Sequence, residues 1–292
     1  MKSLKLNSSI DLKREGKSFY WASFFLPKNS KKNAGTLYSI CRYFDDIADK
    51  NDKDQTMYLK DSINEIKNND KNEVNIFLKK NNIHNSIFID LLEGLILDQK
   101  NIEIQNRNEL IKYSYHVAGT VGLMMAKIIG VQHKNAGRSA IDLGIGMQLT
   151  NIARDVFEDA QMQRIYIPAE WMPNLKLSQL NTKTKINIKQ EADVSDAIHK
   201  VINLSEKFYR NGFSGLKYIP FKARLGIYIA ANVYRGIGVK IKKKKKYYRE
   251  RVYLNIFEKI LITIKSILFF IFIPFFNYRY QHIRDSLPNE NL

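Results

Sequence analysis

Polar side chains recur at helical spacing in the stretch QLTNIARDVFED, which begins at Gln148. Asn151, Asp155 and Asp159 follow one another at one-turn intervals, so a helix would place them in a single polar row. Gln148 extends the row by one turn, and Arg154 flanks it. Such a row is typical either of a solvent-exposed helix face or of a binding site, and its spacing does not choose between the two.

A second acidic cluster stands in the stretch YFDDIAD, where Asp45 and Asp49 also lie one helical turn apart. The helix predicted over about 34–49 carries Tyr38 and Arg42 on the same stripe. An aromatic hydroxyl, a guanidinium and two carboxylates are too much polarity for a plain core face. Two such rows on separate helices could face each other and hold hard divalent cations. Clustered carboxylates without paired His or Cys ligands favour Mg²⁺, or Mn²⁺, over zinc.

This combination of groups indicates a particular chemistry. Magnesium held by few carboxylates keeps positions open for phosphate oxygens and water. Arg42 and Arg154 would then take the remaining phosphate charge through charge-assisted hydrogen bonds. The chain has no GxxxxGK[ST] loop and no GxGxxG motif after a strand, so nucleotide-binding folds are not supported. We expect an apolar pocket with a metal–diphosphate mouth, which could ionise an allylic diphosphate and protect the carbocation from water.

The composition favours a helical protein that positions these rows. The chain has 292 residues, 45% of them apolar, which suits one large domain around a single core. Only six Pro and fourteen Gly, without hairpin signals, favour helices over strands. A break is predicted from Pro27 through Lys28–Gly35. Gly119 and Gly122 predict a kink or a close approach of another backbone or a ligand. The single Cys41 excludes an intramolecular disulfide and suits an inert core thiol.

The net charge of +18 favours anionic lipid, polyphosphate substrates or nucleic acid as partners. Lys240 and Lys242–Lys246 precede a mostly apolar segment, 260–276, which is shorter than the ~20 residues that cross a bilayer. We expect this segment to lie in the interface of an anionic membrane, with a last core helix and a true span as alternatives. No stacking motif, zinc finger or basic recognition helix supports a nucleic-acid partner.

The amino-terminal residues lack the continuous apolar region of a secretory signal. We therefore expect a cytoplasmic protein, peripherally associated with the inner face of the membrane.

Four stretches carry a resemblance to a known family. They are SFYWASFFLP (18–27), LYSICRYFDDIAD (37–49), YHVAGTVGLMMAKIIGV (115–131) and QLTNIARDVFEDAQMQRIYIPAEW (148–171). From Ser18 to about Leu254 the chain resembles the squalene/phytoene synthase family, and its motifs are most similar to those of the bacterial phytoene synthases. The resemblance implies an all-α, single-domain isoprenoid-synthase-type helical bundle with a central apolar cavity. It implies this helical domain over residues 1–255. The basic and hydrophobic tail over 256–292 is more extended and apolar than the resemblance explains, and we expect it to be membrane-associated.

The resemblance also implies roles for individual residues, with the two aspartate motifs binding magnesium and two diphosphates. The expected catalytic residues are Asp45, Asp49, Asp155, Asp159 and Tyr38. The expected metal ligands are Asp45, Asp49, Asn151, Asp155 and Asp159. The expected substrate-binding residues are Ser18, Arg42, Tyr115, Gln148, Asn151, Arg154, Tyr234 and Arg251. One departure from the family pattern is Gln163, which stands before Arg164 where the family usually has Gly, so the shape of this loop is open.

The activity implied is a head-to-head condensation of two geranylgeranyl diphosphates. It would run through a cyclopropyl diphosphate intermediate to phytoene, with release of diphosphate and without NADPH, in carotenoid biosynthesis. The alternative within the family is a squalene or dehydrosqualene synthase that joins two farnesyl diphosphates, the former with NADPH. A catalytically inactive membrane scaffold is a third interpretation, against which the intact aspartates count.

Overall fold

A computed structural model describes residues 16–50, 53–99, 102–173, 180, 188–243, 251–272 and 278–290. Predictions for the amino-terminal residues, Lys244–Lys246 and the tail at 273–277 lie outside these described residues. The elements are α2 (Lys17–Ser23), α3 (Lys28–Ala48), α4 (Lys53–Asn68), α5 (Glu73–Lys80), α6 (Asn85–Leu97), β1 (Ile102–Glu103), α7 (Arg107–Ser114), η1 (Tyr115–Gly119), α8 (Thr120–Ile128), α9 (Ala136–Gln161), β2 (Arg164–Ile165), η2 (Ala169–Trp171), α11 (Ile188–Ser214), η3 (Leu216–Tyr218), α12 (Phe221–Lys243) and α13 (Ile256–Phe270).

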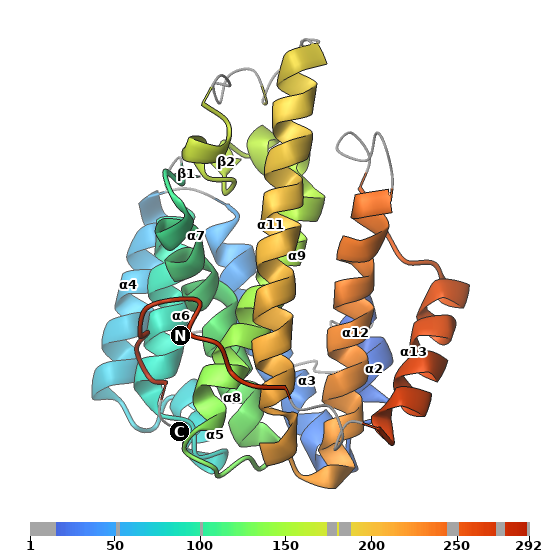
Figure 1. The fold of residues 1–292 in the computed structure, drawn as a ribbon. Coiled ribbons are helices and arrows are strands. Elements are labelled where there is room, and N and C mark those ends of the chain that lie inside the picture. Colours follow the sequence, from blue (N-terminus) through green and yellow to red (C-terminus); the bar gives the residue numbers. More distant parts are fainter. Residues whose placement is uncertain are drawn as a thin grey trace.

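The long helices α9 and α11 pack against each other along the middle of the molecule (Figure 1). Helices α12 and α13 lie on one flank of this pair, whereas α4 and α6 lie on the other. Aromatic and aliphatic side chains such as Phe44, Phe88 and Phe208 are fully buried in one core that runs through these layers. The predicted all-α, single-domain helical bundle is confirmed. The described strands β1 and β2 add one short parallel pair.

The predicted break across Lys28–Gly35 is wrong, because α3 begins at Lys28 and continues without interruption. Pro27 is the residue that caps this helix, with extended backbone angles of φ −55° and ψ 146°. Its carbonyl oxygen accepts the amide of Lys31 at 2.8 Å. Proline fixes φ and lacks an N–H, so it is tolerated where the first helical donors have no partner. The Lys, Asn and Ser residues that follow are compatible with helical backbone.

The backbone of the segment that contains Gly119 and Gly122 touches the backbone of α9 at two places where they cross. A Cβ on Gly122 would overlap the carbonyl oxygen of Ala140, and one on Gly144 would overlap that of Ala118. The turns from Tyr115 to Gly119 also widen into a π-helix. The predicted close approach of another backbone is therefore confirmed at Gly122. These glycines let η1 and α8 lie directly against the helix that carries the second aspartate row.

The last described segment, 278–290, lies across α9 and α11 (Figure 1). Arg284 Nε donates to Asp142 Oδ1 at 2.6 Å, and both side chains are almost fully buried. Asn211 Nδ2 donates to the Gln281 carbonyl at 2.9 Å. These bonds dock the segment on the bundle, whereas α13 lies along α12. Within the parts of the chain that the structure describes, no helix is both long and apolar enough to span a membrane.

Candidate active site

The first aspartate row lies at the C-terminal end of α3. Arg42 Nη1 contacts Asp45 Oδ2 at 2.8 Å, and Arg42 Nη2 contacts Asp46 Oδ1 at 2.6 Å. Asp49 caps the same helix and accepts Arg164 Nη1 at 2.8 Å. Arg164 itself is buried and belongs to β2. The short strand pair therefore anchors a guanidinium against the first row.

The second row lies on α9, where the backbone kinks at Asp155 (φ −106°, ψ 15°). Arg154 contacts both oxygens of Asp155, at 2.7 Å from Nε and 2.5 Å from Nη2. Arg251, far along the sequence, reaches the same carboxylate at 3.0 Å and contacts Glu158 Oε2 at 3.0 Å. The fold thus places the guanidinium groups of Arg154 and Arg251 against the Asp155 carboxylate. Arg251 also pairs with Glu158.

A third carboxylate, Asp98, lines the cavity between the two rows and was not singled out from the sequence. Its two oxygens accept the hydroxyl of Tyr113 at 2.9 Å and that of Tyr166 at 2.7 Å. The two phenol rings stack with centroids 4.6 Å apart. Asp98 adds negative charge beside both Asp45 and Asp159. The two rows therefore face a common acidic space.

Burial and mutual repulsion perturb these carboxyls strongly. Burial, followed by repulsion from Asp49, raises the pKa of Asp45 to about 7. Burial, followed by repulsion from Asp155, raises the pKa of Asp159 to about 8. Burial also raises the pKa of Asp98 to about 6, against the opposing effect of its tyrosine bonds. A divalent cation would relieve this repulsion, because a nearby positive charge favours the ionised carboxylate.

The donor set fits a hard cation. The Asn151 carboxamide oxygen is buried without a hydrogen-bond partner, while its Nδ2 donates to Gln148 Oε1 at 3.3 Å. Carboxylate and carboxamide oxygens are the ligand types that Mg²⁺ takes. Among the described side chains, no three acidic, His or Cys groups converge into a metal-binding group by themselves. Magnesium commonly keeps water and phosphate oxygens among its ligands. Each aspartate row can therefore supply only part of the coordination shell and leave the rest to diphosphate.

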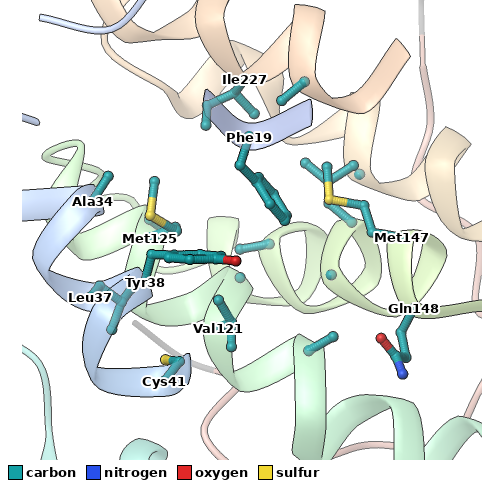
Figure 2. A pocket seen from close by; sticks show the side chains of 18 of the residues that line it. Phe19, Ala34, Leu37, Tyr38, Cys41, Val121, Met125, Met147, Gln148 and Ile227 are labelled. Atoms are coloured by element: carbon teal, nitrogen blue, oxygen red, sulfur yellow. The ribbon is translucent and has the colours of Figure 1, made fainter. Parts of the chain in front are cut away.

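A cavity of about 390 Å³ extends from this acidic mouth into the bundle, and its central apolar body confirms the expectation from the sequence. Figure 2 shows Phe19 and Tyr38 reaching into the same space, with the Tyr38 hydroxyl towards its middle. Cys41 also lines the wall, and burial raises the pKa of its thiol to about 12. It therefore stays protonated, as predicted for an inert thiol. The polar residues at the mouth are Arg42, Asp45, Asp98, Tyr113, Gln148 and Asn151.

The remaining predicted residues divide into two groups. Tyr234 does not itself line the cavity, but its ring packs against that of the cavity residue Phe19, with centroids 4.9 Å apart and planes tilted at 42°, and its hydroxyl lies close enough to Arg154 to feel its charge. Ser18 is half-buried on α2, directly before Phe19. Tyr115 lies elsewhere, because its hydroxyl donates to Asp90 on α6 and it does not line the cavity.

Tyr113 lines the cavity, whereas Tyr115, which the family resemblance implied as a substrate-binding residue, does not. Residues two apart on a helix point to nearly opposite sides, so only one of the pair can face the cavity. The stretch that contains them, KYSYH, gives no signal that distinguishes the two. The same applies to Asp98, whose neighbours carry no recognisable motif.

The sequence pattern of squalene/phytoene synthases matches residues 12–258 of this chain, which contain all of the site residues above. The chain belongs to the squalene/phytoene synthase family. It is therefore a prenyltransferase-type enzyme. It is 31% identical over 243 residues to the 15-cis-phytoene synthase of Enterobacter agglomerans, covering 77% of this chain and 81% of that protein. It is 30% identical to the 15-cis-phytoene synthase of Pantoea ananas over 262 residues, 82% of each chain.

Solved structures agree with the family's fold. A dehydrosqualene synthase crystallised with a ligand superimposes with a TM-score of 0.78 and 26% identity, over 90% of this chain and 95% of that one. A squalene synthase from Alicyclobacillus acidocaldarius has a TM-score of 0.70 at 18% identity, over 82% of this chain and 92% of that one. The second likeness concerns the fold alone.

Proposed function

We propose that this squalene/phytoene synthase family member condenses two geranylgeranyl diphosphates head to head to phytoene, in carotenoid biosynthesis. The observation that carries the proposal is the apolar cavity whose mouth joins both aspartate helices. The relatives from Enterobacter agglomerans and Pantoea ananas, named 15-cis-phytoene synthases, support the choice of substrate.

In the proposed reaction, one substrate loses diphosphate and becomes an allylic cation, which the double bond of the other attacks. Loss of a proton closes a cyclopropyl diphosphate. Loss of the second diphosphate lets the ring rearrange, and a final deprotonation leaves a hydrocarbon with a central double bond. No electrons are added, so NADPH is not needed. The apolar wall around Phe19 and Val121 would exclude water from the cations.

Asp45, Asp49, Asn151, Asp155 and Asp159 would hold Mg²⁺, or Mn²⁺, at the two rows. The metal would neutralise charge on the departing diphosphate. The protein's own cations would act beside it. Arg42 and Arg154 would bind phosphate oxygens, and so would Arg251, because each already neutralises a carboxylate at the mouth. Gln148 and Ser18 would complete the diphosphate contacts.

Tyr38 and Tyr113, which line the cavity, and Tyr234 behind Phe19 would serve as hydrogen-bond donors, with released diphosphate taking the protons. Burial raises the pKa of Tyr113 and of Tyr234 above the ordinary tyrosine value, so neither phenolate forms near neutral pH. Tyr38 would orient the reacting end of the chain, since its hydroxyl points into the cavity (Figure 2).

A dehydrosqualene or squalene synthase reaction with two farnesyl diphosphates is the second candidate, and the dehydrosqualene synthase likeness favours it. Purified protein incubated with Mg²⁺ and each diphosphate separately, with and without NADPH, decides between them. We expect phytoene from geranylgeranyl diphosphate without NADPH. A thirty-carbon hydrocarbon from farnesyl diphosphate, formed only with NADPH (squalene) or without it in place of phytoene (dehydrosqualene), would refute the proposal, and absence of any product would favour an inactive scaffold.

We also propose a cytoplasmic location with peripheral attachment to the inner face of an anionic membrane. The supporting features are the net charge of +18 and the apolar segment after the lysine run. The division into a catalytic region, 1–255, and an attachment tail, 256–292, is part of this proposal. Nucleic acid is not a proposed partner.

A further inference from the structure

Helix α13 has its polarity reversed with respect to an ordinary surface helix. Its buried positions are Thr263 and Ser266, with 6% and 3% of their surfaces exposed. In contrast, Phe257 is 78% exposed and Leu268 is 60% exposed. A helix that packs on a soluble bundle normally buries its apolar stripe and exposes its polar one. The outward stripe, which we call the α13 face, comprises Phe257, Ile260, Leu261, Ile264, Ile267, Leu268 and Ile271.

Specific contacts hold this orientation. The Trp21 indole N–H of α2 donates to Thr263 Oγ1 at 2.9 Å. Asn255 and Glu258 form a capping box at the start of α13. Glu258 also contacts Lys240 Nζ of α12 at 2.8 Å. Gly236 of α12 leaves room for Ile262, because a Cβ there would lie 2.6 Å from Ile262 Cδ1. The bundle therefore fixes α13 through its polar side, Ile262 and Phe270, and leaves the apolar stripe outside.

Basic side chains border the α13 face. Lys243 is exposed at the end of α12, where Lys240 contacts Glu258 at the start of α13. Lys265 is exposed on α13 itself, and Lys222 lies beside Phe221, which packs on Phe270 at the other end. An apolar stripe with lysines at both ends is complementary to a bilayer with anionic headgroups. A second copy of this chain, which has the same whole-chain net charge of +18, would be repelled rather than attracted.

The wall behind this surface is also a wall of the cavity. Phe19, Ala22 and Ser23 of α2 line the cavity, while Trp21 of the same short helix contacts α13. Helix α12 contributes Ile227 to the cavity and packs against α13 (Figure 2). Only the α2–α12 layer therefore separates the apolar cavity from α13.

We propose that the α13 face docks on an anionic bilayer and that the hydrocarbon product leaves the cavity through the α2–α12 wall into the lipid. The part that concerns product rests on the proposed function, whereas docking does not. An insoluble hydrocarbon delivered at this wall would avoid water throughout. The acidic mouth, which is formed by α3 and α9 and not by this wall, would stay open to soluble diphosphates.

Flotation with vesicles tests the docking. Full-length protein is mixed either with vesicles of phosphatidylcholine alone or with vesicles in which about a third of the lipid is anionic phosphatidylglycerol. We expect the protein to float with the anionic vesicles. Leu261→Glu/Leu268→Glu should reduce partitioning at least about tenfold, because each charge sits within the stripe. The matched control is Met57→Glu/Ile76→Glu, which alters exposed apolar residues of α4 and α5 and should float like wild type.

The two tryptophans of the chain, Trp21 and Trp171, report which side docks. With spin-labelled lipid, Trp21 in a Trp171→Phe background should be quenched, whereas the additional emission that wild type owes to Trp171 should not. Equal flotation of the Leu261→Glu/Leu268→Glu variant and wild type would overturn the proposal. So would a concentration-dependent dimer that this variant abolishes, since the α13 face would then bind a second copy.

Turnover distinguishes docking from product release. Anionic vesicles should stimulate steady-state turnover of wild type, while the Leu261→Glu/Leu268→Glu variant should match wild type only in detergent. Vesicle binding without vesicle stimulation would retain the docking and overturn the exit route. Vesicle binding by a protein that forms no hydrocarbon from any diphosphate would refute the proposed function, overturn the exit route and leave the docking intact.

Discussion

Removing the Tyr113 hydroxyl tests how the buried Asp98 is held at the mouth of the cavity. The hydroxyl donates to Asp98 Oδ2 at 2.9 Å, and Asp98 is 6% exposed. A hydrogen bond to a buried charge contributes about 1.5–3 kcal/mol. For a domain of this size such a loss lowers Tm by roughly 3–12 °C. We therefore expect a clearly lower Tm for Tyr113→Phe at pH 8, where Asp98 is ionised.

The loss of stability in Tyr113→Phe should depend on pH in a way that identifies the charge on Asp98 as its cause. The folded pKa of Asp98 is raised to about 6 from an ordinary 3.8, so ionisation of Asp98 destabilises the fold as pH rises through that window. The Tyr113 bond lowers this pKa, and its removal raises the pKa further. At pH 5 Asp98 is mostly protonated, and a neutral bond contributes only ~0.5–1.5 kcal/mol. The loss of stability should therefore be larger at pH 8 than at pH 5.

The assay is thermal unfolding of wild type, Tyr113→Phe, Asp98→Asn and the double variant at both pH values. In the Asp98→Asn background, removal of the Tyr113 hydroxyl should cost about 1 kcal/mol less stability at pH 8 than it does in wild type, because the carboxylate charge is absent. Kinetics with the same proteins compares the two tyrosines. We expect Tyr113→Phe to lower kcat/KM about tenfold or more, and Tyr115→Phe to leave it near wild type. An equal Tm loss at both pH values, or additive effects in the double variant, would refute the reasoning.

Four further perturbations follow from the site, the Gln163 loop and the helix crossings. Asp155→Ala should abolish product formation with helical circular dichroism unchanged; an active variant would contradict the proposed metal site. Without Mg²⁺, Tm should fall as pH rises from about 5 to 8, because raised carboxyl pKa values such as that of Asp159 make ionisation unfavourable in the folded state. Added Mg²⁺ should flatten this slope, and identical slopes would argue against cation binding. Gln163 has a φ of 59°, so Gln163→Gly should keep Tm while Gln163→Val lowers stability by ~1–2 kcal/mol, as chemical denaturation would measure. Gly144→Ala should cost about 1–3 kcal/mol or more, because its methyl would overlap a backbone carbonyl.

The sequence by itself determined the helical rows, because helix periodicity is a local property. Spacing put Asp45 with Arg42 and Asp155 with Arg154, and the structure retains both pairs. The family match then extended from these motifs to the fold. The sequence did not determine the shape of the loop at Gln163. The structure gives Gln163 a left-handed backbone, which is the conformation that Gly adopts most easily.

Only the tertiary structure decided which neighbouring side chains meet across the bundle. It gave Tyr113 to the cavity and Tyr115 to Asp90, because the rotation of a helix about its axis is set by all of its packing partners. It joined Arg251 to Asp155 across a long stretch of chain. It also turned the polar side of α13 inward. An apolar helix pattern is the same whether its partner is a protein core or lipid, so the sequence alone does not reveal which side of α13 the bundle covers.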